Sequence, residues 1–184
     1  MAQTQVKLKF TVEDYHNLPE SETKRYELLG GELIMAPAPI PYHQEISGKL
    51  HFALVQYVRD HHWGKVYAAP LDVILSDEDV VQPDILFISR ERSKIIHEDG
   101  IHGAPDLVIE TLSPATAGRD RTLKRTLYAR SGVQEYWLVD PDSKSAEVLT
   151  LGPQGYQLAG RYEKNQTLRS PLLAGLSIAL AEIF

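Results

Sequence analysis

The sequence predicts an α/β fold, with a mixed central β-sheet flanked by helices, in a single domain that covers residues 1–184. Three observations support this prediction. One long segment carries an apolar residue at every fourth position, which is typical of an amphipathic helix. Several short apolar runs lie between turn signals, which is typical of strands. Two of these runs enclose a helical segment, and this order predicts a βαβ unit with two parallel strands.

The N-terminal third predicts a helix, a hairpin and a second helix. Thr11 can cap a short helix whose first turn is acidic. Two apolar runs then flank Gly30-Gly31, which is a strong signal for a two-residue hairpin turn. From Tyr42 to about Gly64 the spacing predicts an amphipathic helix. Its apolar positions recur every four residues, at Ile46, Leu50, Leu54 and Val58.

The middle of the chain predicts three strands and a helix. Two strand-like runs, KVYAAPLDVIL and VVQPDILFIS, are joined by a polar turn at 76–79. A third run, APDLVIETL, is short and nearly all apolar, which is typical of a strand buried on both faces. The segment SPATAGRD predicts a loop. A helix should then run from about Arg121 to Arg130 and end at Gly132. We expect one of its sides to carry Leu123, Leu127 and Tyr128.

The C-terminal third predicts further strands. The run QEYWLVD ends at Pro141-Asp142 and completes the βαβ unit that begins with PDLVIE. The runs AEVLTL and YQLAGRYE flank the turn GPQG and predict a hairpin. The last stretch, GLSIALAEIF, is compatible with a strand or with a helix.

Composition and charge exclude several classes of protein. The chain has 19 Lys+Arg, 25 Asp+Glu and no Cys, for a net charge of −6. The lack of cysteine excludes a disulfide framework, thiol catalysis and Cys-ligated zinc. Net acidity argues against a non-specific nucleic-acid coat protein, which would be basic. The sequence shows neither a signal peptide nor an apolar run near the ~18 residues of a membrane span, so we expect a cytoplasmic protein without a membrane partner.

Three acidic residues, Asp84, Asp106 and Glu110, stand inside apolar runs, where an unpaired carboxylate is costly to bury. Asp84 follows Pro83, and a proline in a strand pattern favours a distortion that would let Asp84 face a cleft. Glu110 is near the carboxyl end of its strand, where α/β sheets place their sites. Two carboxylates on neighbouring strands would suit Mg²⁺ or Mn²⁺. The alternative is that Asp84 caps a turn and Glu110 pairs with an arginine.

Asp120 and Lys124 are four residues apart and share one side of the predicted helix. They form either a surface ion pair, worth about 0.3–0.5 kcal/mol, or a functional pair in which Lys124 reaches the carboxylates and orients a water or a phosphate. The neighbouring basic residues could hold a phosphate backbone or form a solvated face. These residues are Arg119, Arg121, Lys124, Arg125 and Arg130.

His43 begins the long helix, where it either caps the helix or completes a metal site. Glu27 and Glu32 bracket the Gly30-Gly31 turn, and one of them could complete the site from across the cleft. We interpret His61 and His62, at the end of the long helix, as structural. The remaining histidines match no ligand spacing: His16, His51, His97 and His102. The sequence contains no HExxH, P-loop, GxSxG or GxGxxG motif.

Several of these segments together resemble the Uma-two family of restriction-endonuclease-like proteins. The segments are YELLGGEL, PYHQEI, VVQPDILF, GAPDLVIETLSP, the D-x-x-x-K of Asp120 and Lys124, and GVQEYWLVDP. The resemblance runs from about Tyr26 to about Pro141 and is expected to continue to residue 184. The family resembles a branch of the PD-(D/E)XK nucleases. This implies a restriction-endonuclease-like core with a mixed sheet, and Mg²⁺-dependent (or Mn²⁺-dependent) hydrolysis of phosphodiester bonds.

Carried over by residue, the resemblance implies that Asp84 and Glu110 are catalytic and bind the metal. The sequence departs from the superfamily pattern at Leu112, which stands where a lysine is usual, and the implied replacement is Lys124. Asp106 is too close to Glu110 to lie on a separate strand, so the metal role goes to Asp84. Four residues are candidates for a supporting role: Glu32, His43, Gln82 and Asp120.

The leading hypothesis is therefore a metal-dependent endonuclease that acts on nucleic acid, with DNA as the expected substrate. A homodimer is expected, because two sites related by a two-fold axis can cleave two strands. The alternative is a non-catalytic module for nucleic-acid binding or assembly that keeps the nuclease fold. The acidic balance and the absent strand lysine motivate it. A third hypothesis is a hydrolase of small phosphoesters.

Overall fold

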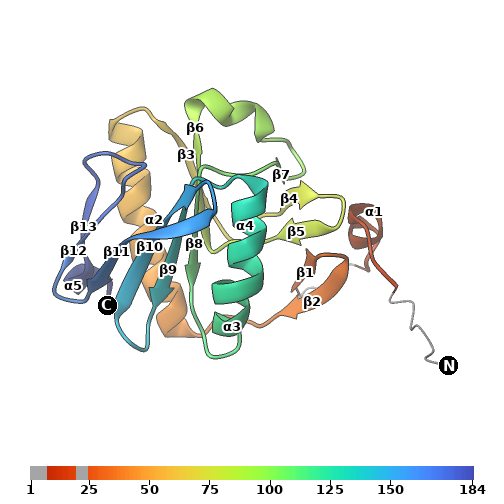
Figure 1. Cartoon of the computed structure of the whole chain (residues 1–184), viewed down its shortest axis with the longest axis horizontal. Coiled ribbons are helices and arrows are strands. Elements are labelled where there is room, and N and C mark those ends of the chain that lie inside the picture. Colours follow the sequence, from red (N-terminus) through yellow and green to blue (C-terminus); the bar gives the residue numbers. More distant parts are fainter. Residues whose placement is uncertain (1–7, 20–24) are drawn as a thin grey trace.

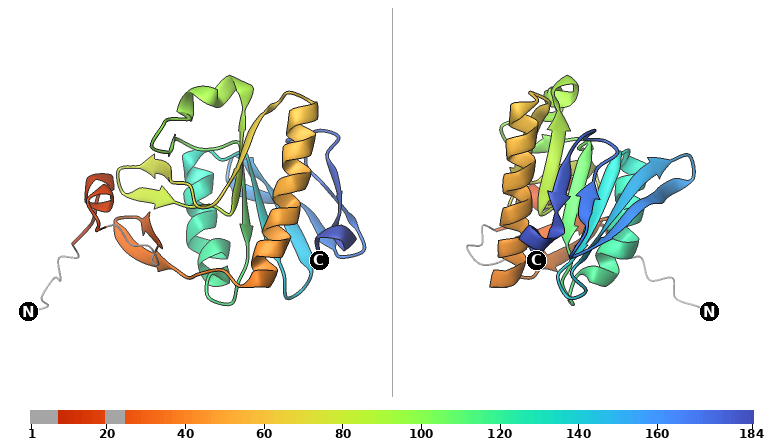
Figure 2. Two further views of the ribbon diagram at one scale, coloured as in Figure 1. Left: turned by 180° about the vertical axis from the view of Figure 1, so that it is seen from behind. Right: turned by 90° about the vertical axis from the view of Figure 1, so that its left-hand side faces the viewer.

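The computed structural model describes residues 8–19 and 25–184. Its framework is a six-stranded mixed sheet with helices on both faces (Figure 1), as predicted. A five-stranded sheet and a two-stranded ribbon join this framework. Helix α2 lies on one face of the six-stranded sheet, and the helical segment α3 to α4 lies on the other (Figure 2).

The N-terminal elements form as predicted. Helix α1 (Val12–His16) begins with a capping box in which Thr11 and Asp14 bond each other's backbone N–H. Strands β1 (Arg25–Leu29) and β2 (Glu32–Ala36) form an antiparallel hairpin. Gly30 and Gly31 have φ of 59° and 80°, and glycine adopts such values without strain.

Helix α2 (Pro41–Asp60) confirms the predicted amphipathic helix, with proline at its first position, where no N–H is required. The residues at four-residue spacing face the sheet and are at most 2% exposed: Ile46, Leu50, Leu54 and Val58. They form one hydrophobic core together with alternate residues of the six-stranded sheet.

The six-stranded sheet has the order β11-β10-β9-β8-β6-β3. Strand β8 pairs with β9 in parallel and with β6 antiparallel, so the predicted βαβ unit is confirmed. Every residue of β8 is buried. The strands are β3 (Gly64–Ala68), β6 (Ile85–Ser89), β8 (Leu107–Thr111), β9 (Glu135–Asp140), β10 (Ser145–Gly152) and β11 (Gly155–Glu163).

The second sheet has the order β2-β1-β5-β4-β7 and corrects the prediction of two long strands. Run 65–75 is split into β3 and β4 (Val73–Ser76), and run 80–89 into β5 (Asp79–Val81) and β6. Each run contains a proline, Pro70 or Pro83, whose nitrogen cannot donate to a strand ladder. The two halves of each run therefore lie in different sheets, and Asp84 stands where the chain passes from one sheet to the other. A 3₁₀ turn, η1 (Arg90–Ile95), and the short strand β7 (Ile101–His102) follow.

The segment after β8 also differs from the prediction. The expected loop already becomes helical at α3 (Ala117–Arg119), which continues as a π-helical turn, η2 (Asp120–Lys124), and then as α4 (Arg125–Ser131). Leu123 is 60% exposed, whereas Leu127 and Tyr128 are buried as expected. The wider π-turn rotates the residues that follow it about the helix axis, so that polar side chains of the turn face inward and Leu123 faces outward. Gly132, with φ of 89°, ends the helix as predicted.

The C-terminal stretch contains both of the elements that its sequence allowed. Strand β12 (Thr167–Arg169) pairs with β13 (Ser177–Ala179), and α5 (Leu180–Ile183) follows directly. Leu180 and Ile183 pack into the core beneath α2. Within the described part of the chain, no helix is both long and apolar enough to cross a membrane.

Candidate functional site

Asp84 and Glu110 meet at the junction between the two sheets. Ile85 of β6 lies opposite Ile109 of β8, so the next residue outward on each strand brings these two acids together. Asp84 Oδ2 accepts a hydrogen bond of 2.7 Å from the backbone N–H of Thr111. The Asp84 side chain is 22% exposed and that of Glu110 is 6% exposed. The pair thus has one carboxylate open to a ligand and one in the protein interior.

Lys124 reaches this pair from the π-turn. Its Nζ lies 3.0 Å from Glu110 Oε1, 2.8 Å from Glu27 Oε1 and 3.8 Å from Asp120 Oδ1. The Lys124 and Asp120 side chains are almost fully buried, so they are not a surface ion pair. The hydroxyl of Tyr128, one turn further along, donates to Glu110 Oε1 at 2.7 Å. π-turns inside helices occur frequently at functional sites, and this one places a buried cation against three carboxylates.

Glu27 enters the site from β1 of the second sheet. Besides Lys124, its carboxylate accepts a hydrogen bond of 3.0 Å from the backbone N–H of Gln82, and its other oxygen lies 3.6 Å from Arg119 Nη1. The sequence allowed either Glu27 or Glu32 to complete the site. Glu27 does so, whereas Glu32 lines a separate cavity beside α4, so the structure does not bring Glu32 to these residues.

His43 approaches from the start of α2. Its Nε2 lies 2.8 Å from the carbonyl oxygen of Thr111 and 3.2 Å from Asp84 Oδ2. Burial lowers the pKa of His43, but the hydrogen bond and charge of Asp84 outweigh burial, so the pKa is raised. The imidazole thus holds Asp84 and the end of β8 in place.

The electrostatics of the site follow from burial. Burial raises the pKa of Glu110, and Asp120, Asp84 and Glu27 raise it further against the opposing effect of Lys124. Burial also lowers the pKa of Lys124, but the three carboxylates outweigh burial and raise it, so Lys124 remains an ammonium. Lys124 and Arg119 supply two positive charges against the carboxylates of Glu27, Glu110 and Asp120, so an added cation would stabilise the ionised forms of Glu110 and Asp120.

These residues line one cavity of about 290 Å³. Among the residues predicted from sequence, it brings together His43, Gln82, Asp84, Glu110, Asp120 and Lys124. Arg25 and Arg119 also line it. Within residues 8–19 and 25–184, two buried side-chain atoms lack a hydrogen-bond partner, His43 Nδ1 and Asp120 Oδ1, and both belong to this cavity. Such atoms at one site are typical of a place where a ligand or ion binds.

Sequence reasoning missed two contributors to the site. Tyr128 was predicted only to share one side of the helix with Leu123 and Leu127, although its spacing of four residues from Lys124 already placed these two on one side as well. The backbone of Thr111 carried no signal, because the N–H that bonds Asp84 and the carbonyl that contacts His43 do not depend on residue type. Asp106 lies at the other end of the strand, where its carboxylate accepts from Ser89 N and pairs with Arg92.

The basic residues after β8 contact acids or a backbone carbonyl of the protein. Arg121 lies 3.4 Å from Asp140 and 3.2 Å from Glu147. Arg130 lies 2.6 Å from Asp79. Arg125 donates to the carbonyl of Tyr156. Arg121, Arg125 and Arg130 are therefore compensated by groups of the protein. Arg25 and Arg119 line the cavity itself, where Arg119 lies 3.6 Å from Glu27.

The mixed sheet carries two acids at adjoining ends of neighbouring strands, with a buried lysine beside them. This fold and this arrangement are those expected of the class of restriction-endonuclease-like proteins. The chain belongs to the Uma2 family, described as "Putative restriction endonuclease", whose family model matches residues 12–181. This membership points to a nuclease. No protein of curated function matches the chain at a significant level.

The fold is also similar to a solved structure from Anabaena variabilis, described as a "putative nuclease belonging to DUF820". The two chains share 24% sequence identity and superpose with a TM-score of 0.78, over 95% of this chain and 97% of the other. The likeness shows that both have the restriction-endonuclease-like fold.

Proposed function

We propose that this protein is a Mg²⁺-dependent endonuclease that hydrolyses phosphodiester bonds of nucleic acid, with DNA as the expected substrate. The observation that carries the proposal is the cavity in which Glu27, Glu110 and Asp120 surround the ammonium of Lys124 while Asp84 faces Glu110. A set of oxygen donors beside a buried cation suits both a hard metal ion and a phosphate.

Asp84 and Glu110 would hold the ion. Their carboxylates fit Mg²⁺ or Mn²⁺, which prefer oxygen ligands, and the unpartnered Asp120 Oδ1 is a further oxygen at the same cavity. When bound, Mg²⁺ lowers the pKa of a coordinated water and stabilises charge on the leaving oxygen.

The protein's own groups would position the reactants. Lys124 stays charged and so acts as a donor, which orients the attacking water or a non-bridging oxygen of the scissile phosphate. Glu27 and Tyr128 fix Lys124 and Glu110 respectively through contacts of 2.8 and 2.7 Å. His43 keeps Asp84 aimed at the cavity. Arg25 and Arg119, which line the cavity, would contact the flanking phosphates.

Isosteric variants test the site. Asp84→Asn and Glu110→Gln should each abolish Mg²⁺-dependent cleavage of plasmid DNA and of single-stranded DNA and RNA, because each removes a charged metal ligand. Mn²⁺ titration by calorimetry should lose its binding isotherm in Asp84→Asn, and circular dichroism should show that the fold is kept. Asp60→Asn, at an exposed carboxylate at the end of α2, is the matched control and should behave as the wild type.

Cleavage that persists in rigorously purified Asp84→Asn protein would overturn this site. Oligonucleotide binding without turnover, unaffected by loss of Asp84, would favour the non-catalytic binding or assembly module. Turnover of a nucleotide analogue but of no polymer would favour a small-phosphoester hydrolase.

The proposal extends to a cytoplasmic homodimer, because two copies can address both strands of a duplex. Sedimentation equilibrium at working concentration checks the oligomeric state. A monomeric mass with and without duplex DNA would contradict the dimer and leave the single-strand chemistry intact.

A further inference from the structure

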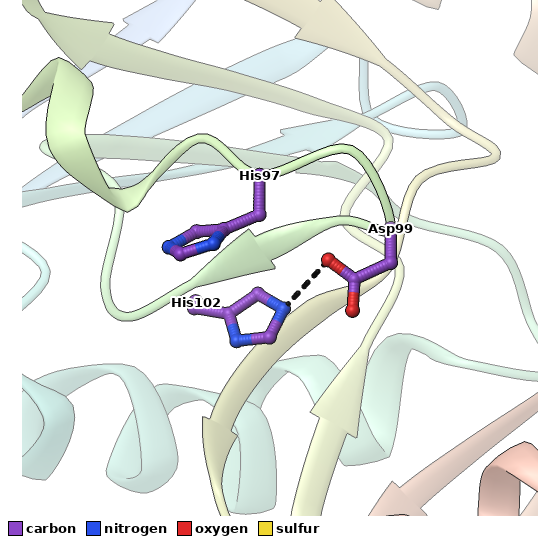
Figure 3. A group of neighbouring side chains, drawn as sticks. All are labelled: His97, Asp99 and His102. Carbon is purple, nitrogen blue, oxygen red and sulfur yellow. Dashed lines mark hydrogen bonds and ion pairs between the residues drawn. The ribbon is translucent and has the colours of Figure 1, made fainter.

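Three side chains converge at β7 and the loop that precedes it, outside the cavity lined by Asp84, Glu110 and Lys124, which is called the nuclease cavity from here on. They are His97, Asp99 and His102, and Figure 3 shows them gathered around one loop. His102 Nε2 lies 3.0 Å from Asp99 Oδ1. The two imidazole rings have centroids 4.3 Å apart. One donor atom from each of the three residues lies within 4.8 Å of the other two. This cluster was not predicted, because the spacing of its residues along the chain matches no ligand motif.

The backbone holds the three residues together. Ile96 and Ile101 form an antiparallel bridge, and His97 N–H donates to the carbonyl of Gly100 at 2.9 Å, which closes a tight turn around Asp99. Ile101 N–H donates to the carbonyl of Asp72, also at 2.9 Å, and anchors the turn to the second sheet. The arrangement therefore follows from main-chain bonds and does not depend on the His102–Asp99 contact alone.

Gly100 is required for this turn. Its φ is 151°, and a Cβ at this position would lie 2.9 Å from the carbonyl oxygen of Asp72. A side chain here would force the turn away from the second sheet. The glycine at position 100 thus allows the two arms of the turn to bring His97 and His102 together.

We propose that His97, Asp99 and His102 form a binding site for a late first-row transition-metal ion, with Zn²⁺ as the ion to test. Two imidazole nitrogens and one carboxylate oxygen are a donor set for Zn²⁺, at bond lengths of about 2.0–2.2 Å. Donor atoms around a tetrahedral ion with such bonds lie about 3.3–3.6 Å apart. The separations of 3.0 Å for one pair and up to 4.8 Å overall bracket this value, so small side-chain rotations suffice.

The site differs chemically from the nuclease cavity. Imidazole nitrogens favour Zn²⁺, Ni²⁺ or Cu²⁺ over Mg²⁺, whereas the cavity offers mainly carboxylates. All three side chains are exposed, so an ion can enter without any opening of the fold. Three protein ligands leave a fourth position for water or for an external ligand.

The experiment uses the full-length Asp84→Asn protein, freed of metal, so that binding at the nuclease cavity is already weakened. Calorimetry with Zn²⁺ should show one ion per chain, and Co²⁺ substitution should give the visible absorption of a site with nitrogen and oxygen ligands. Asp99→Asn and His102→Gln, each added to this background, should weaken Zn²⁺ binding by at least the roughly 10–100-fold that loss of an outer partner costs.

His62→Asn is the matched control. It removes an exposed imidazole at the end of α2, where φ is 54° and asparagine is tolerated. It should bind Zn²⁺ as the background protein does. Asp99→Asn preserves side-chain shape, and circular dichroism of each variant verifies the fold. Zn²⁺ binding that is unchanged in both loop variants, or no Zn²⁺ binding in the background protein, would overturn the proposal. Neither result bears on Mg²⁺-dependent cleavage, which is measured separately.

Discussion

Lys124 is the residue on which the electrostatics of the nuclease cavity depend. It supplies the ammonium that contacts Glu27, Glu110 and Asp120, and only 5% of the residue is exposed. The position two residues after Glu110, where related nucleases place a lysine, holds the buried Leu112. A lysine on the following helix can reach the same oxygen because the π-turn directs its side chain inward. Lys124 thus places an ammonium beside Glu110 although its place in the chain differs from the usual pattern.

Replacement of this ammonium should destabilise the fold. Lys124→Met keeps the length of the side chain but leaves three buried carboxylates without their cation, which should cost about 3–5 kcal/mol of unfolding free energy. Lys65→Met, at an exposed lysine on β3, is the control and should stay within about 0.5 kcal/mol of the wild type. Urea denaturation at neutral pH measures both variants. Equal stability of Lys124→Met and wild type would show that the carboxylates do not rely on Lys124.

At the scale of elements, the hydrophobic pattern predicted several helices and strands well, but it did not predict how buried polar groups change the path of the backbone. The four-residue period of α2, the Gly30-Gly31 turn and the all-apolar β8 are local signals, and each element formed as predicted. The prediction of two long strands was wrong. The apolar residues of the two runs continue across Pro70 and Pro83, but at each proline the backbone passes from one sheet to the other. The helical phase around Leu123 was wrong for a similar reason, since a π-turn is selected by the tertiary contacts of Lys124 rather than by periodicity.

Glu135, the first residue of β9, connects this strand to the C-terminal segment. Its buried carboxylate accepts from Trp137 Nε1 at 2.7 Å, from Ser170 Oγ at 2.6 Å and from Leu172 N–H at 2.9 Å. All three partners are donors, so an amide at this position would set its NH₂ against one of them. Glu135→Gln should therefore cost about 1–3 kcal/mol of unfolding free energy.

The cost of Glu135→Gln should also depend on pH. Burial raises the pKa of Glu135 above its ordinary value of 4.5, although its three hydrogen bonds act in the opposite direction. The folded protein thus binds the proton more tightly than the unfolded chain, so this contribution to stability is complete below pH 4.5 and is lost as pH rises through the folded pKa. Urea titrations from acid to neutral pH should show the stability difference between wild type and Glu135→Gln shrinking. A difference that grows with pH would contradict the raised pKa.

At the scale of the whole molecule, both candidate sites depend on the second sheet, whose position no local pattern reveals. This sheet supplies Glu27 to the nuclease cavity and anchors the turn that carries His97 and His102. Sequence reasoning placed Asp84 and Glu110 together because β6 and β8 are both strongly patterned. It left Glu27 and Glu32 as alternatives, because the choice depends on how the hairpin packs against the helix that carries Lys124.

The side chain of Asp79 connects this sheet to the rest of the molecule. Its side chain is 4% exposed; Oδ1 accepts from Gly30 N–H at 2.8 Å, and Oδ2 accepts from Ser76 Oγ and Arg130 Nη2, each at 2.6 Å. Arg130 is 58% exposed, so water can replace Asp79 as its partner, whereas the backbone donor of Gly30 lies inside the hairpin turn. The two ends of this ion pair should therefore contribute unequally to stability.

Asp79→Ala should cost about 1–3 kcal/mol of unfolding free energy, because it leaves buried donors unsatisfied. Arg130→Ala should cost about 0–1 kcal/mol, the usual value of an exposed ion pair. Amide hydrogen exchange separates a local effect from a global one. In Asp79→Ala, the amides of β1 and β5 should exchange faster at conditions where those of β8 and β9 remain protected, because the second sheet can loosen while the six-stranded sheet stays packed. Uniform acceleration across both sheets would mean that they unfold as one unit. The nuclease cavity, which lies at their junction, would then be no more mobile than the core beneath α2.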